Sequence, residues 1–146
     1  IGTDLWDEVY PVGRDSLYQA EARKFAMDVL GYKWLTNYAS RCGRVKAARS
    51  KAMETSSLSQ EIDFNQNSTD HIYKVETPDG LLPASGKASS FLRYADTDIS
   101  AGVCNEGKGY RSVSVGFPIE TITDESMMTG LMKAIMDFFA KGSTSR

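Results

Sequence analysis

The sequence contains very little histidine and cysteine, and this limits the metal chemistry open to it. There is one histidine, His71, and there are two cysteines, Cys42 and Cys104. A structural zinc site needs four clustered ligands, so the sequence predicts no such site, and no motif indicates a bound cofactor. The even cysteine count leaves two alternatives open, one disulfide or two free thiols.

An excess of one charge and long apolar runs are also missing. Lysine and arginine number 17 and aspartate and glutamate 19, for a formal net charge of −2. A near-neutral chain argues against a nucleic acid or an anionic membrane as the main partner. No apolar stretch approaches the about 20 residues that a transmembrane helix requires, so we expect no membrane span.

The chain opens at Ile1 with no basic, apolar leader segment. Such a start is typical of a processed chain or an excised domain. We therefore expect residues 1–142 to be a single domain from the C-terminal part of a larger chain. Residues 143–146 are expected to form a frayed tail.

Two stretches have the periodicity of amphipathic helices. Apolar residues recur at helical spacing over about 15–30, and Gly31 follows where a left-handed helix end is common. Methionine, leucine, isoleucine and phenylalanine form a broad stripe over 127–139, with Thr123 or Asp124 as the N-cap. We predict a helix at each place.

Short candidate strands fill the middle of the chain. They lie near residues 32–36, 45–47, 61–64, 91–94, 99–104 and 110–119, between turns rich in glycine, proline and aspartate. Residues 71–76 alternate in the same way, whereas Pro83 and Gly86 predict an irregular stretch. Residues 50–70 are polar, and only Leu58, Ile62 and Phe64 could anchor this surface excursion.

The last strand runs directly into the last helix, which suggests a strand–helix unit. We therefore expect an α/β fold with a mixed, partly parallel sheet flanked by helices. The expected sheet is a fragment of a larger domain. It is either completed by strands upstream of Ile1, or mixed and partly antiparallel.

Two stretches carry a resemblance to a known family. One is Gly2-Thr3-Asp4 with the first helix and then Gly31-Tyr32-Lys33-Trp34; the other is the segment 110–122, which includes Val115-Gly116-Phe117-Pro118-Ile119-Glu120. Together they resemble the C-terminal region of large secreted Bacteroidetes proteins labelled xanthan lyase or N-acetylmuramoyl-alanine amidase. That region is similar to a class I glutamine-amidotransferase-like module.

The resemblance implies a flavodoxin-like fold and a secreted, periplasmic or cell-surface location. In amidotransferases a cysteine nucleophile lies on a sharp strand-to-helix turn, which would place it upstream of Ile1. Where these enzymes have His-Pro-Glu after a late strand, this chain has Phe117-Pro118-Ile119-Glu120 and no histidine. A cysteine nucleophile needs a base, so the resemblance implies a degenerate, non-catalytic module.

Three residues are candidates for catalysis. Glu120 follows a buried strand and a proline, where α/β sheets present functional side chains, and Asp4 is its companion from an end loop. Two carboxylates about 5–9 Å apart could do acid–base work on a sugar. His71 is the only candidate imidazole base. Each has a structural alternative, as a helix cap, a salt-bridge partner or an exposed loop side chain.

Trp6 and Tyr10, in an early loop, are candidate ligand-binding residues because aromatic rings can stack on sugars. Trp34 and Tyr38 are further aromatics that could stack on sugars, and core packing is the alternative for Trp34. Residues 96–100 present alternating oxygens as calcium loops do, but the glycine and distal glutamate of such loops are not in register. A turn between strands is the alternative there.

These patterns lead to one expected function and two alternatives. The expectation is an accessory, non-catalytic module of a secreted protein, with polysaccharide or cell-wall glycan and other domains of the parent chain as partners. One alternative is a hydrolase or lyase module whose nucleophile lies upstream of Ile1. The other is a structural dimerisation domain, which would form a homodimer and expose an apolar patch on the last helix.

Overall fold

The computed structural model describes residues 17–65, 69 and 71–141, and these form an antiparallel sheet with two helices. The strands are β1 (Tyr32–Thr36), β2 (Arg44–Ala47), β3 (Ile62–Asp63), β4 (Gly80–Pro83), β5 (Ala88–Tyr94), β6 (Ser100–Gly107) and β7 (Tyr110–Val115). The helices are α2 (Leu17–Phe25) and α3 (Glu125–Ala140).

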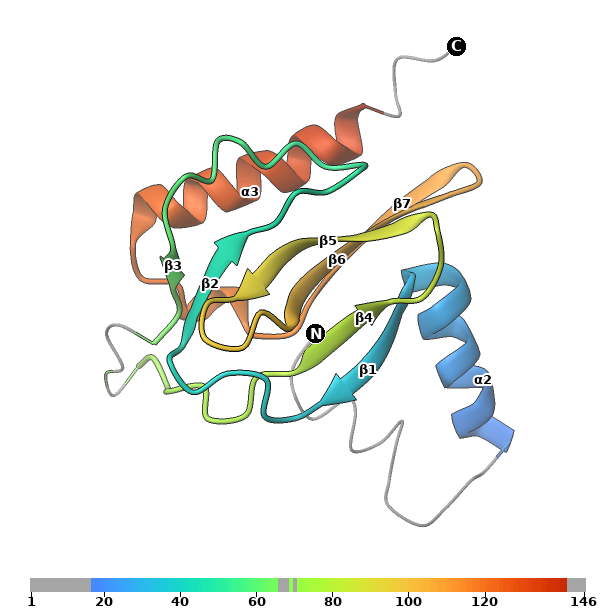
Figure 1. The fold of residues 1–146 in the computed structure, drawn as a ribbon, viewed down its shortest axis with the longest axis horizontal. Helices are drawn as coiled ribbons and strands as arrows, with labels where there is room; N and C mark the ends of the chain where they lie inside the picture. Colours follow the sequence, from blue (N-terminus) through green and yellow to red (C-terminus); the bar gives the residue numbers. More distant parts are fainter. Residues whose placement is uncertain (1–16, 66–68, 70, 142–146) are drawn as a thin grey trace.

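Strand β6 organises the sheet. The spatial order is β1-β4-β6-β5-β2-β3, and β7 also pairs with β6. On the edge away from β5, β4 pairs with β6 only at Ser100, and β7 pairs with it from Gly102 onward. Helix α3 runs beside β2 and β5, and α2 lies beside β1 and β4 (Figure 1).

The prediction of a mixed, partly parallel, flavodoxin-like sheet was wrong, because every strand pair of the described residues is antiparallel. Parallel strands need a crossover of a dozen or more residues, usually a helix. Within the described ranges no helix lies between β1 and β7. In the sequence, the passage from β7 to α3 resembles the first half of a strand–helix–strand crossover. No described strand follows α3, however. This helix therefore covers the sheet and does not link two parallel strands.

Helix α2 ends as the sequence predicts. It continues as a π-helical turn over Ala26–Leu30, and Gly31 closes it at φ 84°. A Cβ at Gly31 would lie 2.5 Å from Asn105 Cβ, so both the left-handed backbone and the close approach favour glycine. Asn105 Nδ2 donates to Val29 O at 3.0 Å, which ties this helix end to β6.

Helix α3 begins at one of its two predicted caps. Asp124 is the N-cap, and its Oδ1 accepts a hydrogen bond from Met127 N at 3.0 Å. This bond, which satisfies an orphan helix N–H, also lowers the pKa of Asp124. The buried residues of α3 then face the sheet at Leu131, Ala134, Ile135 and Phe138.

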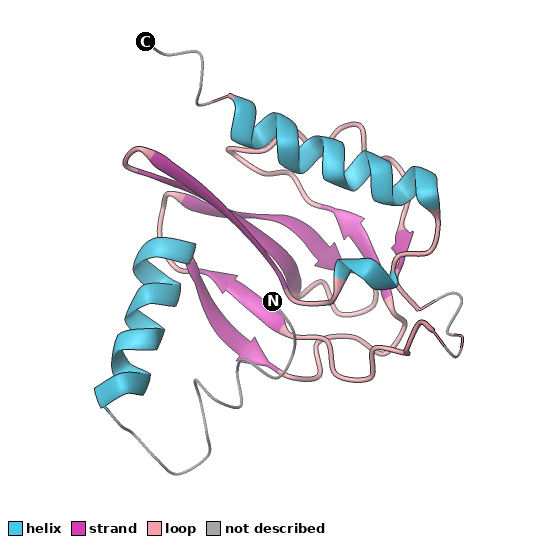
Figure 2. Ribbon diagram, turned by 180° about the vertical axis from the view of Figure 1, so that it is seen from behind, coloured by secondary structure: helices cyan, strands magenta, loops and turns pink. Residues whose placement is uncertain are grey.

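The larger core lies between α3 and the sheet. Leu58, Ile62 and Phe64 are buried there, which confirms them as anchors of the surface excursion. The Phe64 ring stacks on Phe117 with centroids 4.4 Å apart. A smaller cluster packs the end of the first helix against β1, β4 and β6. Figure 2 shows α2 and α3 on opposite sides of the strands.

Candidate functional site

A groove of about 320 Å³ lies between β7 and α3. Its walls are mainly apolar, with a few polar groups at the sides. The lining residues are Tyr73, Val113, Ser114, Val115, Phe117, Pro118, Ile119, Glu120, Met132, Ile135 and Phe139. Apolar hollows with a few convergent polar groups are the usual form of a ligand site, so this groove is the candidate site.

Glu120 reaches the groove from a short 3₁₀ turn, Ile119–Thr121, which follows β7. Thr121 is 1% exposed, and its Oγ1 donates to Pro118 O at 2.7 Å. Thr121 N also donates to Pro118 O, at 3.2 Å, so the side chain and the backbone of Thr121 together fix the turn. The turn therefore holds Glu120 at the surface while its neighbours pack inward.

Tyr73 lies across from Glu120 although the two are 47 residues apart. Its hydroxyl donates to Glu120 Oε1 at 3.3 Å, and the residue is 55% exposed. In the described part of the chain Glu120 has no ion-pair partner. A carboxylate and an exposed aromatic ring thus stand together at one end of the groove.

The described residues that line the groove supply only one member of the expected catalytic pair. Among the described residues that line it, Glu120 is the only carboxylate, and acid–base work on a sugar needs two. Its predicted companion, Asp4, lies outside the described residues, as do the predicted ligand-binding residues Trp6 and Tyr10.

His71 is not brought to the groove. It is exposed, and its backbone N–H donates to Thr69 Oγ1 at 3.2 Å in a small turn. It is absent from the described residues that line the groove. Since a general base must reach the group it deprotonates, the described structure does not pair His71 with Glu120.

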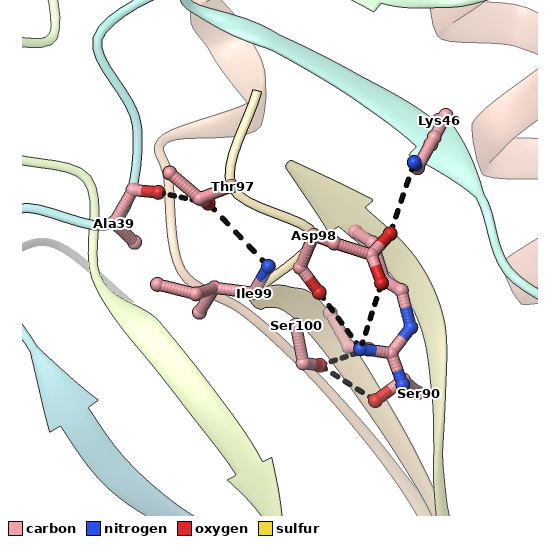
Figure 3. Close-up of polar contacts among 9 residues, drawn as sticks. Ala39, Lys46, Ser90, Thr97, Asp98, Ile99 and Ser100 are labelled. Carbon is pink, nitrogen blue, oxygen red and sulfur yellow. Dashed lines mark hydrogen bonds and ion pairs between the residues drawn. The ribbon is translucent and has the colours of Figure 1, made fainter. Parts of the chain in front are cut away.

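In the oxygen-rich loop 96–100, the side-chain oxygens of Thr97, Asp98 and Ser100 point in different directions (Figure 3). Thr97 Oγ1 donates to Ala39 O at 2.6 Å, and Asp98 pairs with Lys46 Nζ at 2.9 Å. Each oxygen is used for a protein contact, so they do not converge on one point. The described residues hold no group of three or more histidine, cysteine or acidic side chains that could bind a metal.

Asp96 has a structural task in this loop. Its carboxylate accepts hydrogen bonds from Ser40 Oγ and Arg41 N, both at 2.8 Å, and from Cys42 N at 3.3 Å. Desolvation opposes ionisation, but these bonds outweigh it and lower the pKa of Asp96 from 3.8 to about 2. The carboxylate therefore joins the β5–β6 turn to the loop before β2.

We expect Asp96→Asn to destabilise the fold at neutral pH and not near pH 2. A lowered carboxyl pKa stabilises the folded state above the unfolded-state pKa, and this stabilisation is lost as pH falls through the folded-state pKa. The amide carries no charge, and with its oxygen on the backbone N–H groups of Arg41 and Cys42 its NH2 replaces the acceptor for Ser40 Oγ. Urea unfolding from pH 6 to 2 should show wild type and variant converging between about pH 4 and 2. Asp137→Asn, on the exposed face of α3, is the control, and equal pH profiles for wild type and Asp96→Asn would contradict this role.

Both cysteines are free thiols. Cys42 lies beside Ser40, at 3.6 Å between Sγ and Oγ, on the 40–43 loop. Cys104 is buried next to the hydroxyls of Ser50 and Ser89. Of the two alternatives that the sequence leaves open, the structure contains the free thiols.

Asp79 is a buried carboxylate that the sequence did not reveal. It is 2% exposed, its Oδ1 accepts from Trp34 Nε1 at 3.1 Å, and its backbone oxygen accepts from Tyr94 Oη at 2.7 Å. Desolvation, with help from the carboxylates of Asp79 and Asp96, raises the pKa of the Tyr94 phenol. The segment Pro78-Asp79-Gly80 is typical of a surface turn, so nothing in the local pattern indicates this burial.

Comparison with known proteins yields no match: no family model, curated protein or solved structure is similar to this chain at a significant level. In the described ranges, no helix combines the length and apolar content needed to cross a membrane. The site is therefore characterised by its own geometry, as an open, mainly apolar groove with one carboxylate and one exposed tyrosine.

Proposed function

We propose that this chain is an accessory, non-catalytic module of a secreted or cell-surface protein that processes polysaccharide or cell wall, and that it binds glycan in the β7–α3 groove. The observation that carries the proposal is the Tyr73–Glu120 pair, placed over an apolar floor. The family resemblance noted from the sequence suggests the ligand class.

The groove has the chemistry that a sugar needs. The apolar face of a pyranose ring can pack on the exposed Tyr73 ring and the apolar walls. The hydroxyls can donate to Glu120, and hydrogen bonds to an ionised group are stronger than neutral ones. A volume of about 320 Å³ is in the range of small-ligand sites and suits a short glycan segment.

Binding is better supported than catalysis. The alternative, a hydrolase or lyase whose nucleophile lies upstream of Ile1, would need a base or a second carboxylate at the groove. Of the described lining residues, only Glu120 could serve, and it is solvent-exposed with no charged partner in that part of the chain. One exposed carboxylate can orient a hydroxyl, but it cannot supply both proton donor and acceptor.

We expect Tyr73→Ala and Glu120→Gln each to weaken glycan binding at least about tenfold. A hydrogen bond to a charged group contributes about 1.5–3 kcal/mol, and each 1.4 kcal/mol is a factor of ten. Calorimetric titration with xanthan and peptidoglycan oligosaccharides would measure the effect.

Tyr38→Ala is the matched control, since Tyr38 is 74% exposed and does not line the groove. It should bind like wild type. Absence of binding to every oligosaccharide, or a loss in Tyr38→Ala that Tyr73→Ala does not share, would refute the proposed site. Turnover of an oligosaccharide would refute the non-catalytic role.

A further inference from the structure

Strand β7 has an edge that no described strand occupies. One side of β7 pairs with β6 along its whole length without a register shift, and the other side has no strand partner in the described ranges. Gly116 N donates to Ala101 O at 2.9 Å. Because the ladder alternates, the backbone groups of Arg111, Val113 and Val115 point away from β6, toward this open edge.

The described residues give this edge none of the usual protection against pairing. Proteins blunt exposed edges with lysine, proline or a bulge, or cover them with another segment. Residues 110–115 contain no lysine or proline and follow a regular register. Their one charge, Arg111, is neutralised by Glu106 at 2.9 Å. The edge of β7 is therefore able to accept another strand.

An apolar stripe on α3 rises above this edge. Met132, Ile135, Met136 and Phe139 fall on one face of the helix at i, i+3, i+4 and i+7. Three of them line the groove over β7, while Met136 is 59% and Phe139 40% exposed. A single strand added to the edge of β7 would extend the sheet but leave the apolar stripe of α3 uncovered. A partner that carries a helix above its own edge strand would cover the stripe as well.

The charges at the two ends of β7 are complementary. Lys108 is exposed in the β6–β7 turn, just before β7, and Glu120 is exposed just after its other end. Neither has an ion-pair partner among the described residues. A strand that runs antiparallel to β7, with a positive charge before it and a negative charge after it, would satisfy both, and β7 itself has this arrangement.

We propose that a second copy of this chain docks on this face, with β7 of each copy pairing antiparallel to β7 of the other. With Val113 at the two-fold axis, Arg111 of one copy lies opposite Val115 of the other copy. The two Arg111 side chains therefore do not face each other. Lys108 of each chain lies alongside the Glu120 end of the other. Since the axis is perpendicular to the sheet, both α3 helices lie on the same side and their exposed stripes meet. The two sheets become one continuous sheet.

Light scattering coupled to size-exclusion chromatography, over a range of concentrations, tests the pairing. The expected result is a dimer, with twice the 16.1 kDa chain mass, that dissociates on dilution. Lys108→Glu and Glu120→Lys should each raise the dissociation constant roughly tenfold, because each replaces two attractions by two repulsions. The double variant should recover most of the wild-type affinity.

Met136→Glu tests the helix part of the interface without touching the core. It should raise the dissociation constant, while the circular dichroism spectrum stays that of wild type. Lys33→Glu, on the exposed side of β1, is the matched control and should change nothing. A monomer at every concentration would overturn the proposal, and so would a dimer insensitive to the charge swaps and to Met136→Glu. Both proposals use Glu120 and the β7–α3 groove, so glycan and a second copy would compete for this face. Sizing without glycan tests the pairing alone, and titration at concentrations where the chain is monomeric tests glycan binding alone.

Discussion

Replacing Phe117 with alanine is expected to lower the free energy of unfolding by about 4 kcal/mol. Phe117 is 1% exposed, and its ring stacks on Phe64, which has no exposed surface. Truncation removes buried apolar area and leaves a cavity at the junction of β7, the excursion and α3. Equilibrium unfolding in urea measures the loss, provided that the slope with urea is unchanged.

Phe139→Ala is the control for Phe117→Ala. Both rings line the same groove, but Phe139 is 40% exposed. Its truncation should cost well under half as much. Equal costs for the two variants would mean that the Phe64–Phe117 stack is not the centre of the core.

Local elements of this fold could be predicted from the sequence, since local patterns dictate them. Gly31 directly after an amphipathic stretch indicated the left-handed end of the first helix, and it has φ 84°. Asp124 was a predicted N-cap of the last helix, and its side chain does accept a hydrogen bond from Met127 N there. Both depend on neighbours within a few residues.

The sheet arrangement could not be predicted in the same way. The strand–helix step at the end of the chain was read as part of a parallel unit, because strand direction is not encoded in the pattern of one strand. The region 32–115 contained no second helical pattern, and that absence was the signal for antiparallel pairing.

Strand β4 was missed for a related reason. Pro83 predicted an irregular stretch, since proline cannot donate to a sheet ladder. In the structure Pro83 is the last residue of β4 and lies opposite Tyr32 on β1. The only pairing of β4 with β6 is at Leu81, so Pro83 interrupts no ladder bond on that side.

Of the two residues that define the candidate site, the sequence predicted one. Glu120 was identified by its place after a strand and a proline, and it does line the groove. Tyr73 comes from a segment whose alternation resembled a strand, but it lies in a loop between β3 and β4. A contact between residues 47 apart in the chain depends on tertiary packing, and no local pattern encodes it.

Replacing Gly116 with alanine is expected to destabilise the fold by about 3 kcal/mol. A Cβ there would lie 2.1 Å from Asp79 O, and Asp79 N donates to Gly116 O at 2.7 Å, so the two backbones cannot separate without losing this bond. Gly130→Ala is the matched control, because its Cβ would meet only Leu58 at an ordinary 3.7 Å. In mid-helix that change should raise stability by about 0.5–1 kcal/mol. The same added methyl group should therefore act with opposite sign at the two sites in urea unfolding, and a neutral Gly116→Ala would show that β7 and the start of β4 are not in such close contact.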